Sequence, residues 1–152
     1  PLLVNDRVDL ALAIDADGVH LGDDDLPVAV ARDLLGPDAI VGRSVSFVDD
    51  ARDAVAAGAD YLGVGAIYAT DSKSDIPDDE YAIGLDRLGE IAAAVDVPIV
   101  AIGGIDASNA TDVIAAGADG VAVISAITAA DDPEAAAREL RATVDRGRDR
   151  RS

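Results

Sequence analysis

Acidic side chains follow two short apolar runs near the start of the chain. Asn5 and Asp6 come directly after the run that ends at Val4, and Asp25 belongs to an acidic cluster just beyond Leu21. Carboxylates of this kind can hold Mg²⁺, with water and substrate phosphate completing its coordination. The alternative is that both acids are solvated loop residues, although Asp6 directly after a buried strand fits that interpretation less well.

A second polar group follows the apolar run 61–64. A glycine-containing turn leads into Thr70, Ser72 and Lys73, and Lys73 is the one lysine of the chain. Two hydroxyls and an ammonium within four residues suit the oxygens of a pyrophosphate, because charge-assisted hydrogen bonds are about twice as strong as neutral ones. A mobile polar loop without a ligand is the alternative.

Two later apolar runs, 99–102 and 121–124, are followed by glycine and serine. Gly104 comes just after the first run, and Ser125 follows Ile124 at the end of the second. Glycine lets the backbone approach a ligand, and N–H groups at helix starts favour an anion. The pattern indicates a phosphate site and does not identify what the phosphate is attached to.

His20, the one histidine, lies within the apolar run 19–21. Histidine is the usual general base, but the alternation of His20 with buried neighbours favours a hydrogen-bonded structural role. No Ser-His-Asp order, metal-binding histidine pair or Walker A loop is present in the sequence. We therefore assign no catalytic role to His20.

The elements that must position these residues alternate between short β-type runs and Ala-rich helical segments. Alternation of this kind implies parallel strands joined by right-handed crossovers. The predicted strands are residues 2–4, 19–21, 40–41, 61–64, 99–102 and 121–124, and the clearest predicted helices are residues 49–57 and 85–95. An Ala-Asp repeat at residues 16–19, 59–62 and 118–121 closes a helix and opens a strand each time, with Gly58 and Gly117 as helix C′ glycines.

We predict an α/β fold, namely a TIM (β/α)₈ barrel that lacks its first two β/α units. Six units fill the chain, whereas a complete barrel usually needs at least about 200 residues. An open sheet of six strands is the alternative. We expect the barrel domain to cover residues 1–145 and a disordered tail, without apolar residues, to cover residues 146–152.

The composition argues against several classes of function. The 30 acidic and 12 basic residues give a net charge of −18, which would repel nucleic acid and anionic membranes. The sequence shows neither a long apolar run nor a signal-peptide pattern, so we expect a cytoplasmic protein without a membrane span. The excess of Asp and the scarcity of Lys are similar to those of proteins from halophiles.

Taken together, these segments resemble thiamine phosphate synthase. The matching stretches follow the family's order and span nearly the whole chain. They are residues 3–9, 16–22 with Asp25, 58–65, 70–73, 102–105 and 116–127. Any one of these stretches would be weak evidence, whereas the ordered set is strong.

The resemblance implies a transferase of thiamine biosynthesis that uses Mg²⁺ as cofactor. In the family's reaction, the ring nitrogen of thiazole phosphate displaces pyrophosphate from hydroxymethylpyrimidine diphosphate, which gives thiamine phosphate. The family is thought to pass through a pyrimidine carbocation. Such a step depends mainly on groups that neutralise the departing pyrophosphate, which agrees with the absence of a convincing general base.

Site residues follow from the resemblance position by position. It implies that Asp6 and Asp25 are the Mg²⁺ ligands and that Asn5 lies beside the diphosphate. The expected catalytic residues are Ser44, Thr70, Ser72 and Lys73, of which the last three match the family's pyrophosphate loop. The expected thiazole phosphate cradle consists of Gly104, Ile124 and Ser125.

Some features depart from the family's pattern. Ala66 and Ala69 stand where the family usually has prolines, and the family's second strand, which supplies basic and amide groups to the diphosphate, is absent. This absence leaves open a catalytically incomplete phosphate-binding fragment. A thiazole tautomerase of the same barrel family is the other alternative, although it would not need both Asp6 and Asp25. Unpaired strand edges also lead us to expect homo-oligomers.

Overall fold

The computed structural model describes residues 1–69 and 82–151. These residues form two compact units. Unit 1 comprises residues 1–63 and 94–98, and unit 2 comprises residues 64–93 and 99–152. The strands follow one another in sequence order from β1 to β6.

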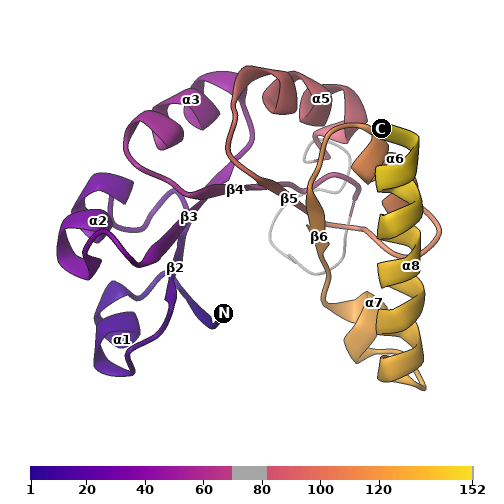
Figure 1. Cartoon of the computed structure of the whole chain (residues 1–152), viewed down its shortest axis with the longest axis horizontal. Helices are drawn as coiled ribbons and strands as arrows, with labels where there is room; N and C mark the ends of the chain where they lie inside the picture. Colours follow the sequence, from indigo (N-terminus) through magenta and orange to yellow (C-terminus); the bar gives the residue numbers. More distant parts are fainter. Residues whose placement is uncertain (70–81, 152) are drawn as a thin grey trace. The chain divides into compact units, whose positions relative to one another are not determined.

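Unit 1 repeats a strand followed by a helix. Its elements are β1 (Leu3–Asn5), α1 (Val8–Ala13), β2 (Gly18–Leu21), α2 (Val28–Leu35), β3 (Ile40–Val45), α3 (Val48–Ala56) and β4 (Tyr61–Val64), whose last residue belongs to unit 2. Strand β2 pairs in parallel with β1 and with β3, so that His20 lies beside Asn5 on one side and Gly42 on the other. Figure 1 shows α1, α2 and α3 along one side of these strands.

The core of unit 1 forms between these helices and strands. Val19, Leu21 and Val41 on the strands are fully buried, and so are Ala31 and Ala51 on the helices. Small helical side chains let the helix axes approach the strands closely, which is why alanine dominates the buried helix faces. His20 alternates with Val19 and Leu21 and therefore lies on the opposite side of β2.

Unit 2 contains the remaining elements. They are α5 (Gly84–Ala94), β5 (Ile99–Ile102), α6 (Ala110–Ala115), β6 (Gly120–Ala122), α7 (Ser125–Thr128) and α8 (Pro133–Arg151). Strands β5 and β6 pair in parallel, with Ile102 beside Ala122. The long helix α8 packs along α6 (Figure 1). Leu88, Ile91 and Ile114 are fully buried in this unit.

The Ala-Asp repeat has a clear structural role in both units. Gly58 and Gly117 follow helix ends with φ of 100° and 127°, as a C′ glycine should. The carboxylates of Asp17, Asp60 and Asp119 then each accept a hydrogen bond from a backbone amide at the start of an earlier strand, at 2.6, 2.7 and 2.9 Å. The repeated aspartates therefore fasten each helix end to a strand start.

The end of the chain differs from the expected disordered tail. Helix α8 continues to Arg151, with Thr143, Val144 and Gly147 buried in it. The Arg151 guanidinium donates hydrogen bonds to the carbonyl oxygens of Gly117 and Ala118. Arg151 in the arginine-rich segment 146–151 thus binds carbonyl oxygens just after the end of α6. Cations interact favourably with the last carbonyl groups of a helix.

The predicted fold class needs correction. The α/β class and the parallel strands agree with the structure, but the prediction of an eight-unit barrel that lacks its first two units is wrong. Residues 1–69 and 82–151 form one six-stranded sheet, with strands β1 to β6 in sequence order. The expectation of two further units rested on the usual length of such barrels. No helix among the described residues has the length and apolarity to cross a membrane.

Candidate active site

Asp6 and Asp25 lie together in unit 1. Asp6 follows β1 in the left-handed region with φ of 65°, and its backbone N–H donates to the His20 carbonyl oxygen at 2.8 Å. The Asp25 carboxylate accepts a hydrogen bond from the Gly22 N–H at 2.6 Å. Desolvation raises the pKa of Asp6, and the charge and hydrogen bond of the neighbouring Asp25 raise it further. The Asp6 and Asp25 carboxyl groups therefore lie close enough for their charges to interact.

This pair fits the predicted Mg²⁺ ligands. Two carboxylates that repel each other at the ends of adjacent strands are a suitable place for a divalent cation, and Mg²⁺ commonly uses only one or two protein carboxylates. Among the described residues, no group of three or more acidic, histidine or cysteine side chains could hold a metal ion. Water and a phosphate oxygen would have to supply the other positions.

Arg43 on β3 was not predicted as a site residue. Its guanidinium donates to the Gly22 carbonyl oxygen and pairs with the Asp23 carboxylate at 2.8 Å. Arg43 is 23% exposed and Asp23 is 89% exposed. Arg43 therefore anchors the loop that carries Asp25. A charged residue just beyond the apolar run 40–41 was the only sequence signal that could have drawn attention to it.

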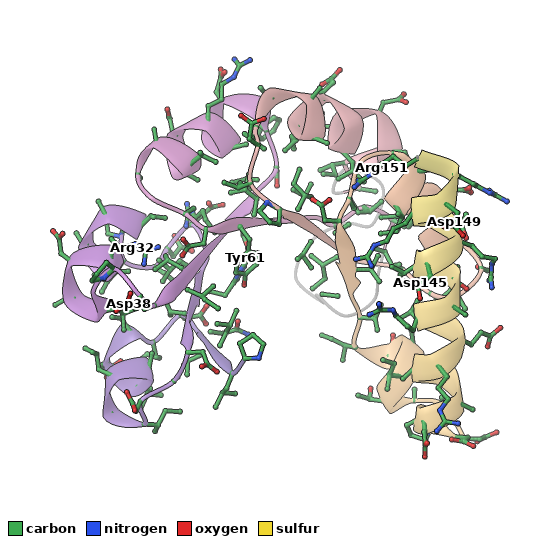
Figure 2. The ribbon with its side chains drawn as sticks, viewed as in Figure 1. Arg32, Asp38, Tyr61, Asp145, Asp149 and Arg151 are labelled. Atoms are coloured by element: carbon green, nitrogen blue, oxygen red, sulfur yellow. The ribbon has the colours of Figure 1, made fainter. Side chains whose placement is uncertain are left out.

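His20 joins two further side chains of unit 1. Its Nδ1 atom lies 2.8 Å from the Tyr61 hydroxyl, and its Nε2 atom lies 2.8 Å from Ser44 Oγ. Burial lowers the pKa of His20, which favours the neutral ring. These bonds agree with the expected hydrogen-bonded role. Tyr61, which the sequence did not single out, lies in Figure 2 on the side of the strands away from Arg32 of α2.

Ser44 and Asn5 occupy accessible positions in unit 1. Ser44 lies on β3 and is exposed, although its hydroxyl oxygen contacts His20. Asn5 is the exposed last residue of β1, beside His20 in the strand register. The two predicted diphosphate contacts, Asn5 on β1 and Ser44 on β3, are therefore both accessible to a ligand in unit 1.

The predicted phosphate cradle lies in unit 2. Gly104 has φ of 64°, and its carbonyl oxygen accepts a hydrogen bond from the Asn109 side chain at 2.9 Å. Ile124 and Ser125 are exposed at the start of α7. Because Ile102 pairs with Ala122, Gly104 and Ile124 both lie two residues beyond paired positions at the same end of two adjacent strands. The structure thus places the cradle residues on one edge of the unit.

The predicted pyrophosphate loop consists of Thr70, Ser72 and Lys73. These three residues lie outside the described residues. A separate pocket of about 380 Å³ in unit 2 is lined in part by Asp106, Ser108 and Glu139. It contains none of the predicted site residues. The described candidate residues therefore form a cluster within unit 1 and, separately, a cradle within unit 2.

Comparisons with known proteins agree on one family. A family model described as thiamine monophosphate synthase matches residues 1–127. The thiamine-phosphate synthase of Haloarcula marismortui is 70% identical over 146 residues, which cover 96% of this chain and 69% of the relative. The thiamine-phosphate synthase of Natronomonas pharaonis is 66% identical, and the match covers 95% of this chain and 67% of the relative.

A solved structure supports the same assignment. The thiamine phosphate pyrophosphorylase from Pyrococcus furiosus matches with a TM-score of 0.84 and 46% identity, over 95% of this chain and 67% of that protein. The chain spans about two thirds of the length of these relatives. The resemblance seen in the sequence is confirmed, as is the expectation of a transferase of thiamine biosynthesis. This chain belongs to the thiamine monophosphate synthase family.

Proposed function

We propose that the chain condenses hydroxymethylpyrimidine diphosphate with thiazole phosphate to give thiamine phosphate and pyrophosphate. The observation that carries this proposal is the proximity of Asp6 and Asp25. Their negative charges repel each other, and a bound cation would remove this repulsion. Departure of a diphosphate requires such neutralisation, whereas isomerisation of a thiazole does not. The pair therefore supports the synthase over a thiazole tautomerase.

Asp6 and Asp25 are the residues that would hold Mg²⁺. The ion, when bound, would supply positive charge to the leaving pyrophosphate. Asn5 and Ser44 would donate hydrogen bonds to the same diphosphate, since both are exposed beside the carboxylates' strands. We assign Thr70, Ser72 and Lys73 to the pyrophosphate as well, on the sequence match and without structural support.

Unit 2 would receive the thiazole phosphate. Gly104, Ile124 and Ser125 are exposed residues just beyond the paired ends of β5 and β6, where backbone N–H groups would bind the anion. We also propose that the chain works in the cytoplasm of a salt-adapted cell, because its net charge of −18 favours a strongly hydrated surface.

The proposal is tested by measuring thiamine phosphate formation as a function of Mg²⁺ and of both substrates. In Asp6→Asn, the Mg²⁺ concentration required for half-maximal rate should rise by about tenfold or more, as expected when one ligand loses its charge. Asparagine tolerates the left-handed backbone of Asp6, so the fold should survive. The KM for thiazole phosphate should change little.

Asp24→Asn is the matched control, because Asp24 is an exposed carboxylate next to Asp25. Its Mg²⁺ dependence should equal that of the unmodified chain. Equal losses of Mg²⁺ dependence and thiazole affinity in Asp6→Asn would argue against a metal role for Asp6. A folded chain that forms no thiamine phosphate at any Mg²⁺ concentration would refute the proposed function.

A further inference from the structure

Three side chains of unit 1 form a continuous hydrogen-bonded row. Tyr61 OH lies 2.8 Å from His20 Nδ1, and His20 Nε2 lies 2.8 Å from Ser44 Oγ. Tyr61 and His20 are half-buried, whereas Ser44 is exposed. The row therefore runs from a half-buried hydroxyl to one that a ligand can reach.

Two glycines, Gly42 and Gly63, make room for the Tyr61 and His20 rings. A Cβ atom at Gly42 would lie 2.2 Å from Tyr61 Cζ, and a Cβ atom at Gly63 would lie 2.9 Å from His20 Cε1. Contacts this short do not occur between real side chains, so glycine at these positions makes room for both rings. The packing holds the imidazole between the two hydroxyls.

A neutral imidazole can orient the row in two ways. In one order, Nδ1 accepts from Tyr61 and the Nε2–H group donates to Ser44 Oγ, which leaves the Ser44 hydrogen available to a ligand. In the other order, Ser44 donates to Nε2 and can then only accept. Among the described residues, His20 is the one hydrogen-bond partner of the Tyr61 hydroxyl. The first order satisfies the Tyr61 hydrogen, whereas the second leaves it without an acceptor there.

We propose that Tyr61 and His20 are positioning residues that fix the imidazole in its Nε2–H tautomer and make Ser44 a hydrogen-bond donor to an anionic substrate oxygen. The catalytic consequence rests on the proposed function, in which Ser44 contacts the diphosphate. A donor already aimed at the place where negative charge develops needs no reorganisation during the reaction. The sequence match assigned Ser44 a contact, and the row supplies the reason that its hydrogen points outward.

Nuclear magnetic resonance of the ¹⁵N-labelled chain tests the tautomer directly, because His20 is the one histidine. The ring nitrogen shifts should show a protonated Nε2 and an unprotonated Nδ1 at neutral pH. In Tyr61→Phe the ring should become a mixture of tautomers. A wild-type ring with the proton on Nδ1, or on both nitrogens, would overturn the proposal whether or not the chain turns over.

Kinetics test the consequence for catalysis. Tyr61→Phe should lower kcat by about fivefold, the factor that corresponds to one neutral hydrogen bond, with the KM for thiazole phosphate unchanged. His20→Ala should lower kcat by about 10²-fold, near the effect of losing one preorganised donor. His20→Gln should recover most of this loss, because its amide N–H can occupy the place of Nε2–H.

Thr111→Val is the matched control, since it removes a half-buried hydroxyl that donates to the Thr143 carbonyl oxygen at 3.3 Å in unit 2. Its kcat should stay at the wild-type value. Equal losses in His20→Gln and His20→Ala, or an unchanged kcat in Tyr61→Phe, would overturn the positioning role. A wild-type chain without condensation activity would instead refute the proposed function, while the ring nitrogen shifts would still decide the tautomer.

Discussion

In unit 1, the polar atoms that could contact a substrate belong to side chains, and in unit 2 they belong to the backbone next to glycine. Asp6, Asp25 and Ser44 in unit 1 are each held by a hydrogen bond from or to a neighbouring residue. In unit 2, Gly103 and Gly104 adopt φ of 99° and 64°, and their carbonyl oxygens accept hydrogen bonds from the Tyr68 N–H and the Asn109 side chain. Substitutions that remove side-chain atoms should therefore impair the candidate residues of unit 1. Substitutions that add a Cβ atom to a glycine should impair those of unit 2.

Gly104→Ala should have the largest effect. The new Cβ atom would lie 2.7 Å from Tyr68 Cβ and 2.8 Å from the Ala69 carbonyl oxygen, at φ of 64°. Left-handed strain and overpacking together should cost roughly 2–4 kcal/mol of unfolding free energy. The KM for thiazole phosphate should also rise, by about tenfold or more. Urea unfolding and steady-state kinetics provide the measurements.

Gly120→Ala is the control for this substitution, because an added Cβ atom there would meet nothing within 4 Å. Its unfolding free energy should stay within about 0.5 kcal/mol of the original chain. If both alanine variants behaved alike, the backbone at Gly104 would not require glycine, and the contrast between the units would be lost.

Arg43→Met should have an intermediate effect on unit 1. The substitution removes the charged donor that anchors the Gly22 carbonyl oxygen and Asp23, and with it the loop that presents Asp25. We expect a loss of about 1–2 kcal/mol in stability and about fivefold weaker Mg²⁺ binding. Urea unfolding and Mg²⁺ titration of the enzyme check both values.

Arg52→Met provides the comparison, because the Arg52–Asp49 pair is 3.8 Å long and both side chains are largely exposed. Such surface pairs contribute about 0–1 kcal/mol, so little change is expected in stability and none in Mg²⁺ affinity. An Arg43→Met variant with unaltered Mg²⁺ affinity would show that the Asp25 loop does not need its anchor.

Arg151→Met should have the smallest effect and concerns a feature common to both units. Arg151 contacts Gly117 and Asp119, as Arg32 contacts Gly58 and Asp60 at the equivalent turn, and Figure 2 marks both arginines. The Arg151–Asp119 pair is partly exposed, at 40% and 46%, so solvent screening limits the expected loss to about 1 kcal/mol at pH 7.

The effect of Arg151→Met should depend on pH. Desolvation alone would raise the pKa of Asp119, but hydrogen bonds from Arg151 and the Ile99 N–H outweigh it and lower the pKa below 3.8. A lowered folded-state pKa gives stability that is present above the unfolded value and lost as pH falls through the folded one. Thermal melts of the two chains should therefore converge in strong acid. The exposed Arg150, 3.9 Å from Asp112, gives the control Arg150→Met.

Much of the fold could be predicted because it depends on local patterns. The strands at 61–64 and 99–102 have the predicted bounds, since short β-branched runs between helices leave little choice. Strand β3 extends to Val45, beyond the predicted Val41, because the adjacent polar residues Arg43 and Ser44 interrupt the apolar run. Strand β6 ends before Ile124, which instead precedes α7.

The candidate site was predictable where residue type and position after a strand sufficed. Asp6, the acidic cluster 23–25 and Gly104 were singled out in this way and remain predicted site residues. The structure places Asp6 close enough to Asp25 for their charges to interact. Arg43 and Tyr61 were missed, because an arginine or tyrosine inside a strand carries no local signal of its partner. Their partners lie about 20 and 41 residues away along the chain.

The amino-acid sequence by itself determined the alternation of strands and helices, the acidic surface and the family. Hydrophobic periodicity, glycine at helix ends and ordered motifs are local properties, so they can be read without coordinates. The tertiary structure alone decided the extent of β3, the continuation of α8 and the meeting of His20 with Tyr61 and Ser44. Those features depend on strand register and on room beside glycine, which exist only once distant segments pack.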